Sequence, residues 1–514
     1  MNKLFAIALL FPLCKNISAQ NELDALRYST IGSGGTARSL GMGGAFSAIG
    51  ADASAAMVNP AGIAVFRRGE FNFGFQFLNT ANNSTYINET YKQSRLNFNI
   101  PTLNLIVTNI KYDENGKPTK KGLVNFNYGF NVNRLANFNN QVVFDAVNKQ
   151  SSVADYFASK ANDDYAKYQE LSPGSLPDLA YLGGAIWDTA GVYTPYYRGL
   201  NRDQRDVHQI GNLSQKGGIY EYQATFGVNL AHKVQIGLGL FYSSLRYDEV
   251  LSITETDQRQ HTGIYTPDMA TLDYQYKLYD RGSAFGARFG LIFRPTDQLR
   301  LGFSIHTPRT FTIKEEYGYS ISVSGDPGSP KSPPSVYTDP LSTYTYKVIT
   351  PARVNAGIGF VIQKIAIVSA DLEFYNYANA SLNAKDYAFN TENAAIRKNY
   401  SNVINLKLGV EFNVPNPDNK DQSYRYRVGY ANMPTPFSTR KAGLDEILKK
   451  SSNLICTGFG FRDKDYYLDF SLTFGSASSY YTPYTVSNPA FPYSNITNKQ
   501  NRTAFSFTVG LNFD

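Results

Sequence analysis

The chain has 514 residues, of which 14% are aromatic and only 18% are charged. This length fits either several ordinary domains or one large all-β architecture with long strands and loops. So few charges beside so many aromatic residues are unusual for a soluble surface and typical of an aromatic-girdled β-barrel. The net charge of +7 is spread along the chain without a basic block, which argues against a nucleic-acid partner.

The N-terminus has the order of a secretory signal peptide. Met1–Lys3 supplies a basic start, Leu4–Leu13 an apolar core, and Ile17–Ala19 a plausible cleavage region. We therefore expect residues 1–19 to be removed. After them, no apolar run reaches the roughly 18 residues that a membrane-spanning helix requires.

The next segment, GADASAAMVNPAGIAVF at residues 50–66, crowds small residues together and has no two-residue period. Asp52–Val58 predicts a short helix capped by Asp52, and Pro60 forces the residue before it out of helical geometry. Asn59 is then expected at a bend, where its side-chain amide can satisfy backbone groups that the bend leaves unpaired.

Strands are expected from residue 68 to the C-terminus. Residues 234–240, 468–474 and 505–513 each alternate between an apolar face and a face of small, polar or glycine residues. A soluble sandwich would carry many Lys and Glu residues on its polar face. Glycine on that face suits a crowded lumen instead, and lipid can cover the apolar face.

The connections between these strands alternate in length. The short connections fall at residues 231–233, 295–298, 363–364, 416–422 and 463–465. The longest insertion runs over 136–216. Short periplasmic turns and long external loops are typical of an outer-membrane barrel. Counting the strands gives about fourteen, so the sequence predicts an all-β fold, a transmembrane antiparallel β-barrel with both termini in the periplasm.

The long insertion contains apolar residues at helical spacing, namely Leu179, Leu182, Ile186 and Trp187. The pattern predicts a long external loop with short amphipathic helices. Two interpretations stay open. The apolar faces can pack on one another to hold the loop together, or they can form an external groove where a hydrophobic ligand first lands.

Charged residues in the predicted wall form a second candidate site. If the apolar residues face lipid, five arginines point into the lumen: Arg288, Arg300, Arg353, Arg425 and Arg427. We expect them to pair with wall carboxylates and with acids of the N-terminal segment such as Asp24 and Asp52. In the alternative, one or two of them receive a carboxylate head group, for which the planar guanidinium is well shaped.

Other chemistry finds little support in the sequence. The histidines show no metal-ligand spacing, and no serine lies in a Gly-x-Ser-x-Gly context with a convincing acid and base. The glycine-rich residues 32–44 have no preceding strand and no following Gly-Lys-Ser/Thr, so they do not predict a phosphate loop. Cys456 is expected as a packed strand residue. We expect no catalytic residues, no metal, no cofactor and no enzyme activity.

The stretch GTARSLGMGGAFSAIGADASAAMVNPAG, residues 35–62, resembles the N-terminal plug of the FadL family of outer-membrane transporters. The plug signature of that family is matched by Asn59, Pro60 and Ala61. The resemblance continues in TPARVNAGIGFVI and IVSADLEFYNYANA. It implies that residues 20–67 form a plug closing the lumen of a barrel of residues 68–514, because a lumen of this size is too wide for wall side chains to fill.

The same resemblance implies a function: passive uptake of hydrophobic small molecules, such as long-chain fatty acids or aromatic hydrocarbons, through a porin-like channel in the Gram-negative outer membrane. The expected partners are outer-membrane lipid, a hydrophobic ligand and the barrel-assembly machinery, with the chain as a monomer. The alternative is a plugged barrel that serves as a docking or shuttle component of a protein-secretion system. Co-extracted lipid in the lumen would favour the first, and co-purifying proteins the second.

Overall fold

The structure is a computed structural model. It describes residues 22–32, 34–189, 191–195, 206–258, 269–325, 335–338, 341–363, 365–438, 450–487 and 492–514. The predicted signal peptide, residues 1–19, lies outside the described residues.

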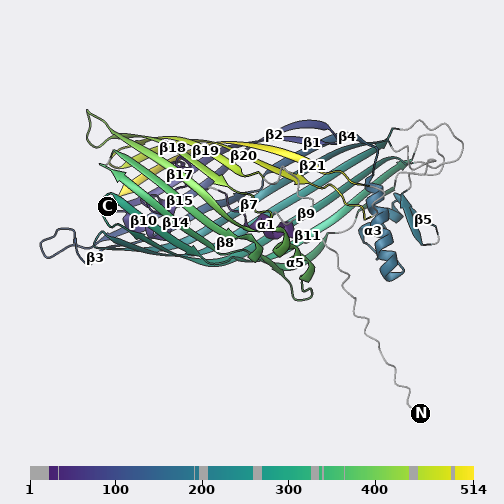
Figure 1. The fold of residues 1–514 in the computed structure, drawn as a ribbon, viewed down its shortest axis with the longest axis horizontal. Coiled ribbons are helices and arrows are strands. Elements are labelled where there is room, and N and C mark those ends of the chain that lie inside the picture. The colour runs from purple at the N-terminus through teal and green to yellow at the C-terminus, as the bar shows by residue number, and fades with distance from the viewer. Residues whose placement is uncertain are drawn as a thin grey trace, which may run out of the picture.

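The described strands form one closed antiparallel barrel of 14 wall positions, as the strand count predicted (Figure 1). Ten positions are single strands: β1 (Gly69–Tyr86), β2 (Glu89–Ile110), β7 (Val207–Leu230), β8 (Val234–Asp257), β9 (Met269–Phe293), β17 (Asn402–Pro415), β18 (Ser423–Met433), β19 (Ser452–Arg462), β20 (Tyr466–Tyr481) and β21 (Ile496–Phe513). The barrel closes because β1 pairs with β21 along almost its whole length.

The other four positions are each built from two consecutive strands. These are β3 (Leu123–Asn137) with β4 (Asn140–Asn148), β10 (Leu299–His306) with β11 (Thr310–Gly325), β13 (Ser342–Ile349) with β14 (Arg353–Ile362), and β15 (Ala366–Asn376) with β16 (Ser381–Asn383). A short strand, β12 (Ser335–Thr338), pairs with β11. Pro308 and Pro351 fall in two of the interruptions, where a residue without an N–H group cannot continue the ladder.

The two faces of the wall are inverted relative to a soluble sheet. On β21, Phe505 and Leu511 are exposed on the outside, whereas Ser506 and Thr508 are buried inside. Residues of β20 follow the same rule, with Phe474 exposed and Asp469 fully buried. The alternation read from the sequence is therefore confirmed, with the apolar face outside, where hydrocarbon can cover it.

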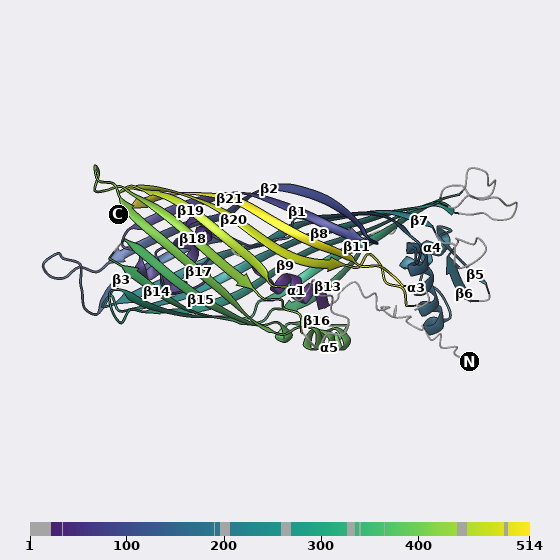
Figure 2. The same cartoon turned by 45° about the horizontal axis from the view of Figure 1, so that its top comes forward.

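The predicted short connections all join neighbouring strands at one end of the barrel, called here the short-turn end, where the C-terminus also lies (Figure 2). Residue 364, in one of them, lies outside the described residues. The boundaries predicted for the long insertion are wrong in part. Residues 140–148 form β4, and the last ten residues of 136–216 belong to β7, so both ends of this range extend the wall. In both stretches alternate side chains are buried, which is a strand period rather than that of a loop.

One stretch of the wall lacks a hydrogen-bonded ladder. β2 pairs with β3 only from Thr102 to Ile110, and the ladder ends beside bulges on both strands, at Ile100–Pro101 and near Leu135. Beyond the bulges β4 turns toward β1, where Asn82 Nδ2 donates to Gln141 O at 2.6 Å. Side-chain contacts therefore take the place of the ladder here.

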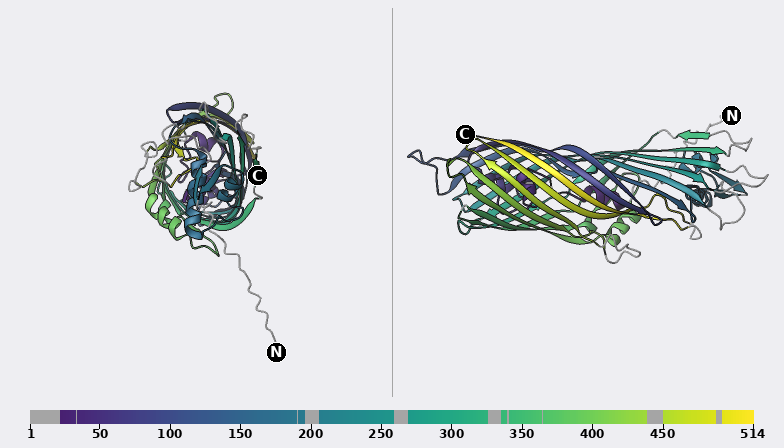
Figure 3. Two further views of the ribbon diagram at one scale, coloured as in Figure 1. Left: turned by 90° about the vertical axis from the view of Figure 1, so that its right-hand side faces the viewer. Right: turned by 90° about the horizontal axis from the view of Figure 1, so that it is seen from above.

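The N-terminal segment, residues 22–66, lies inside the barrel (Figure 3). It contains α1 (Glu22–Ser29), α2 (Ala37–Gly41) and the 3-10 helices η1 (Ala53–Met57) and η2 (Pro60–Val65). Wall glycines make the close approach possible. A Cβ at Gly237 would overlap the Ala61 backbone, one at Gly302 that of Ser47, and one at Gly429 that of Gly43.

At the opposite end of the barrel, α3 (Val153–Tyr168), α4 (Leu176–Leu182) and the hairpin of β5 (Ile186–Thr189) and β6 (Val192–Pro195) form an external cap. A further helix, α5 (Asn390–Asn399), lies at the edge of the wall beside α1 and β16, well short of the external cap (Figure 2). None of the helices in the described part of the chain is long and apolar enough to cross a membrane.

The fit between wall and N-terminal segment predicts the effect of one added methyl group. A Cβ at Gly290 would overlap Asn59 Oδ1, so we expect Gly290→Ala to cost about 1–3 kcal/mol of stability through overpacking. The measurement is the temperature at which the heat-modifiable gel mobility of the purified barrel is lost. Gly359→Ala is the matched control, since its Cβ would meet only ordinary contacts at 3.5 Å or more. Equal transition temperatures for the two variants would contradict the prediction.

Candidate functional site

The corner between η1 and η2 is held by its own side chains. Asp52 caps η1, accepting from Ser54 N, as the sequence predicted. Asn59 is the N-cap of η2, with its Oδ1 accepting from Ala61 N at 3.1 Å. Its Nδ2 donates to Ser47 O at 2.6 Å and to the wall carbonyl of Leu291 at 3.1 Å. Asn59 thus ties two parts of the N-terminal segment to the wall, while Pro60 and Ala61 begin η2 behind it.

The wall also binds the carbonyl groups just before this corner. His306 Nε2 lies 2.8 Å from Val58 O, and Ser304 Oγ donates to the same oxygen at 2.6 Å. Arg353 Nη2 donates to Met57 O at 2.9 Å. A carbonyl oxygen only accepts, so Nε2 of the buried His306 carries the proton and Nδ1 is an acceptor.

His306 joins two buried ion-pair groups. Its Nδ1 accepts from Arg288 Nε at 3.0 Å and from Arg353 Nη2 at 2.6 Å. Arg288 makes a bidentate pair with Glu221 at 2.6 and 2.7 Å. Arg353 pairs with Glu373 at 3.1 Å. Both arginines therefore point inward and are paired with wall carboxylates, which is the arrangement that a buried charge requires.

A second group of charges lies on β17, β18 and β20, next along the wall. Glu411 accepts from Arg427 Nε at 2.6 Å and from Arg38 Nε at 2.9 Å. Arg427 also pairs with Asp469 at 2.7 Å. Arg425 is near this group, with its Nη1 3.6 Å from Glu411.

The N-terminal segment was expected to contribute acids that pair with arginines of the wall, but the structure shows the segment contributing an arginine and the wall the carboxylate. Asp52 accepts from Thr36 and Ser54, and Asp24 pairs with Arg27, all within the segment itself. Arg38 of the segment instead reaches a wall carboxylate, Glu411, in a bidentate pair.

The remaining predicted lumen arginine, Arg300, donates to the carbonyl of Ile49 at 2.7 Å. All five predicted arginines therefore point inward, but they lie in separate groups rather than in one site. His306, Arg38 and Glu221 were not singled out from the sequence. Glu221 lies on the polar face of an alternating strand, and this was the signal that could have found it.

The lumen changes character toward the external cap. The inward positions of β8 begin with Gln235 and Ser243 and continue with Leu245, Leu251 and Ile253, all almost fully buried. Neighbouring strands add aromatic residues. The rings of Tyr276 and Tyr319 are stacked with centroids 5.3 Å apart, and both are half-buried. They contact two hydrophobic clusters, one that includes Ala25 and Tyr28 of α1 and one that includes Phe157 of α3. This half of the lumen is lined by apolar and aromatic side chains together with the buried carboxylates of Glu249, Asp280 and Glu315.

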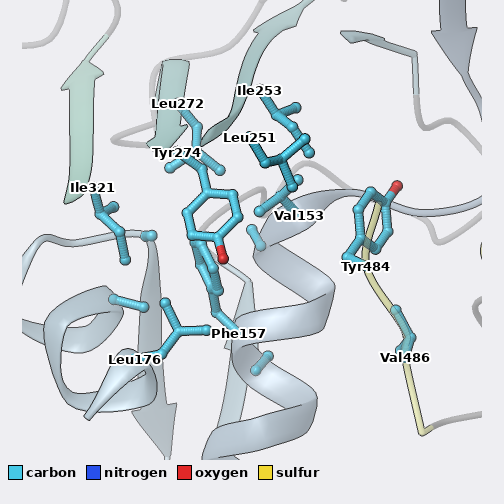
Figure 4. Packing of buried hydrophobic residues seen from close by; sticks show 14 of the residues in the cluster. Val153, Phe157, Leu176, Leu251, Ile253, Leu272, Tyr274, Ile321, Tyr484 and Val486 are labelled. Carbon is cyan, nitrogen blue, oxygen red and sulfur yellow. The ribbon is translucent and has the colours of Figure 1, made fainter. Parts of the chain in front are cut away.

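The external cap is anchored on the inner wall. Buried Glu255 of β8 accepts from Ser152 Oγ at 2.6 Å and from Val153 N at 2.7 Å, at the N-terminus of α3. Phe157 of α3 packs edge-on against Tyr274 of β9, with ring centroids 5.3 Å apart (Figure 4). The cap is thus joined to the barrel by both polar and apolar contacts.

The four residues predicted for an external groove do not share one helix face. Leu179 and Leu182 lie in α4, but Ile186 and Trp187 lie in strand β5, so the predicted helical spacing is wrong for these two. The turn at Gly183–Gly184 ends the helix between them. Leu179 and Ile186 are buried, Trp187 is half-buried, and only Leu182 is mostly exposed, at 51%. Most of these side chains hold the cap together.

Within the residues that the structure describes, no group of three His, Cys, Asp or Glu side chains could hold a metal ion. His208 forms a pair with Asp145 at 2.6 Å, and His232 lies 3.3 Å from Arg67. His261 lies outside the described residues. Cys456 is a buried residue of β19, as predicted.

Comparison with known proteins agrees on the fold. No protein-family model and no curated protein matches the chain. Among solved structures, a Pseudomonas aeruginosa FadL homologue is similar at a TM-score of 0.50 and 13% identity, with 95% of this chain and 100% of that chain covered. The Pseudomonas putida toluene transporter TodX is similar at a TM-score of 0.50 and 12% identity, with 94% and 99% covered. The chain therefore has the fold of the FadL-type 14-stranded β-barrels.

Proposed function

We propose that this chain is an outer-membrane channel for the passive uptake of hydrophobic small molecules. The observation that carries the proposal is the lining of the lumen between the external cap and the N-terminal segment. Leu245 belongs to the buried cluster of the N-terminal segment, Leu251 and Ile253 belong to that of the external cap, and the half-buried rings of Tyr276 and Tyr319 contact both clusters. An apolar, aromatic lining favours a hydrophobic ligand over a hydrated solute.

The location in the outer membrane rests on the outer face of the wall. Large apolar side chains are exposed on most strands, for example Leu96, Phe285, Val428 and Ile455. Exposed apolar area of this extent is unfavourable in water and stable in hydrocarbon. Similar folds are found in the FadL homologue and the toluene transporter, and long-chain fatty acids and aromatic hydrocarbons are the ligand classes that we propose.

We assign residues 20–67 to a plug domain and 68–514 to the barrel domain. The corner at Met57–Asn59 joins them through at least four wall groups, from Leu291, Ser304, His306 and Arg353. In this proposal the corner holds the lumen closed until a ligand enters.

The experiment for the proposed function is uptake of labelled toluene and labelled palmitate by cells that express the chain. We expect faster uptake than in cells without it. Tyr319→Ala should slow uptake about tenfold, which corresponds to the ~1.4 kcal/mol lost with a ligand-facing ring. Tyr319→Phe keeps the ring and should keep uptake. No uptake above background, together with co-purifying proteins, would favour the secretion role instead.

The closing role of the corner predicts a permeability change. Asn59→Ala with Pro60→Gly removes the amide contacts to Ser47 O and Leu291 O and the rigid start of η2. We expect barrel assembly to be retained, as judged by heat-modifiable gel mobility, and bulky hydrophilic antibiotics to enter. The measurement is the minimum inhibitory concentration of such an antibiotic. Parental resistance and parental uptake in assembled protein would show that the corner does not control permeability.

Leu182 and Ile186 of the predicted groove differ most in exposure, so their substitutions should have different effects. Leu182→Ser changes an exposed side chain and should slow ligand uptake if the ligand lands on the cap, without loosening the cap. Ile186→Ser empties a buried position and should cost about 3 kcal/mol of cap stability. Protease sensitivity of the cap on intact cells separates the two effects. Equal uptake by the parent and by Leu182→Ser would remove Leu182 from the ligand path.

A further inference from the structure

Three arginines of the wall converge around one glycine at the short-turn end of the lumen. Arg425 and Arg427 follow each other on the inner face of β18, and Arg425 lies opposite Gly460 of β19. Arg462 is the last residue of β19. A Cβ at Gly460 would overlap Asp469 Oδ1 and come to 2.8 Å from Arg427 Nη2. The glycine therefore leaves the space that the guanidinium group of Arg427 occupies.

Two carboxylates bond to this cluster, and they are already shared. Asp469 accepts from Arg427 Nη1 and from Arg462 Nη2, each at 2.7 Å. Glu411 accepts from Arg427 Nε at 2.6 Å and also forms the bidentate pair with Arg38. Arg425 lies 3.6 Å from Glu411, beyond hydrogen-bond distance.

Two further carboxylates face the region but are engaged elsewhere. Glu70 accepts from Tyr467 Oη and from Asn72 Nδ2, each at 2.7 Å. Asp52 accepts from Thr36 Oγ1 at 2.8 Å and from Ser54. The hydrogen-bonding capacity that these groups leave for the arginines is small.

Each of the three arginines has a buried nitrogen without an acceptor among the described residues: Arg425 Nε, Arg427 Nη2 and Arg462 Nε. Buried donors are almost always paired, and leaving a charged one unpaired is the more costly case. Three such donors from neighbouring side chains therefore mark a place that an anion would stabilise. The planar guanidinium donates best to a carboxylate.

The cluster can be reached from the short-turn end. Arg427 is fully buried, but the side chains of Arg425 and Arg462 keep 26% and 17% of their exposure. Arg425 follows the turn at residues 416–422, and Arg462 precedes the turn at 463–465. An anion could thus approach without passing the N-terminal segment.

We propose that Arg425, Arg427 and Arg462 form a binding site for a carboxylate at the short-turn end of the lumen. The site is separate from the apolar lining that carries the proposed uptake function, and it does not depend on that function. It lies beside the N-terminal segment, because Arg427 shares Glu411 with Arg38.

The test is calorimetric titration of the purified full chain in detergent with sodium acetate at low ionic strength, where charge screening is weak. We expect one acetate per chain. Arg425→Gln should weaken acetate binding by at least about tenfold. Arg425 is the arginine of the cluster whose carboxylate contact, 3.6 Å to Glu411, is the longest, so its loss should disturb the other ion pairs least. Arg462→Gln should weaken it as well. Arg246→Gln, which changes an exposed arginine elsewhere, is the matched control and should bind as the parent does.

Two further measurements are titration with laurate and detection of any carboxylate that the chain releases on unfolding. Binding of laurate but not of acetate, lost in Arg425→Gln, would identify the head group of a lipid-chain carboxylate as the source. A carboxylate released from the parent on unfolding and detected by mass spectrometry, but absent from Arg425→Gln, would also support the site. Equal acetate binding by the parent and by both cluster variants of intact heat-modifiable mobility would overturn the proposal. So would a parent that binds neither acetate nor laurate and releases no carboxylate.

Discussion

The hydrogen bonds between the polar inner face of the wall and the backbone of the N-terminal segment are the interaction on which this structure depends. Because the outer face is apolar, the polar side chains of every strand must find partners inside the barrel. The segment supplies them: Ile63 O accepts from Asn127, Val58 O from Ser304, and Ala45 O from Ser369. Wall and segment thus satisfy groups that neither could satisfy alone.

The same requirement divides the lumen into two parts. Where the N-terminal segment brings backbone carbonyl groups to the wall, inward positions are Asn, Ser, Arg and Glu. Toward the external cap, α3 packs apolar side chains against the wall, and inward positions such as Leu251 and Leu272 are apolar. In the proposed uptake, a hydrophobic molecule would meet the mainly apolar surface on the cap side before the charged, hydrogen-bonded contacts of the N-terminal segment. This gradient links the fold to the proposed uptake.

The buried charges inside the barrel form separate groups of arginines and carboxylates rather than one binding site. Arg288 and Arg353 are neutralised by Glu221 and Glu373 and share His306 between them, close to the Val58–Asn59 corner. The cluster around Gly460 is a separate group, in which Asp469 is shared by Arg427 and Arg462. In the two proposals, the arginines near the corner serve closure and those around Gly460 bind a carboxylate.

The sequence by itself determined the strand period, the short turns, the number of strands and the inward direction of the arginines, because alternation and turn residues are local properties. It also located the bend at Asn59, since a capping side chain and a proline act on their own neighbours. Tertiary structure alone decided that Ile186 and Trp187 form a strand and that Arg38 pairs with Glu411. It also decided that half of the lumen is apolar. Those outcomes depend on contacts between residues far apart in the chain. Near the cap, Leu251 and Ile253 of β8 face inward while Ser252 and Thr254 face outward, so the alternation alone could not say which face lies inside.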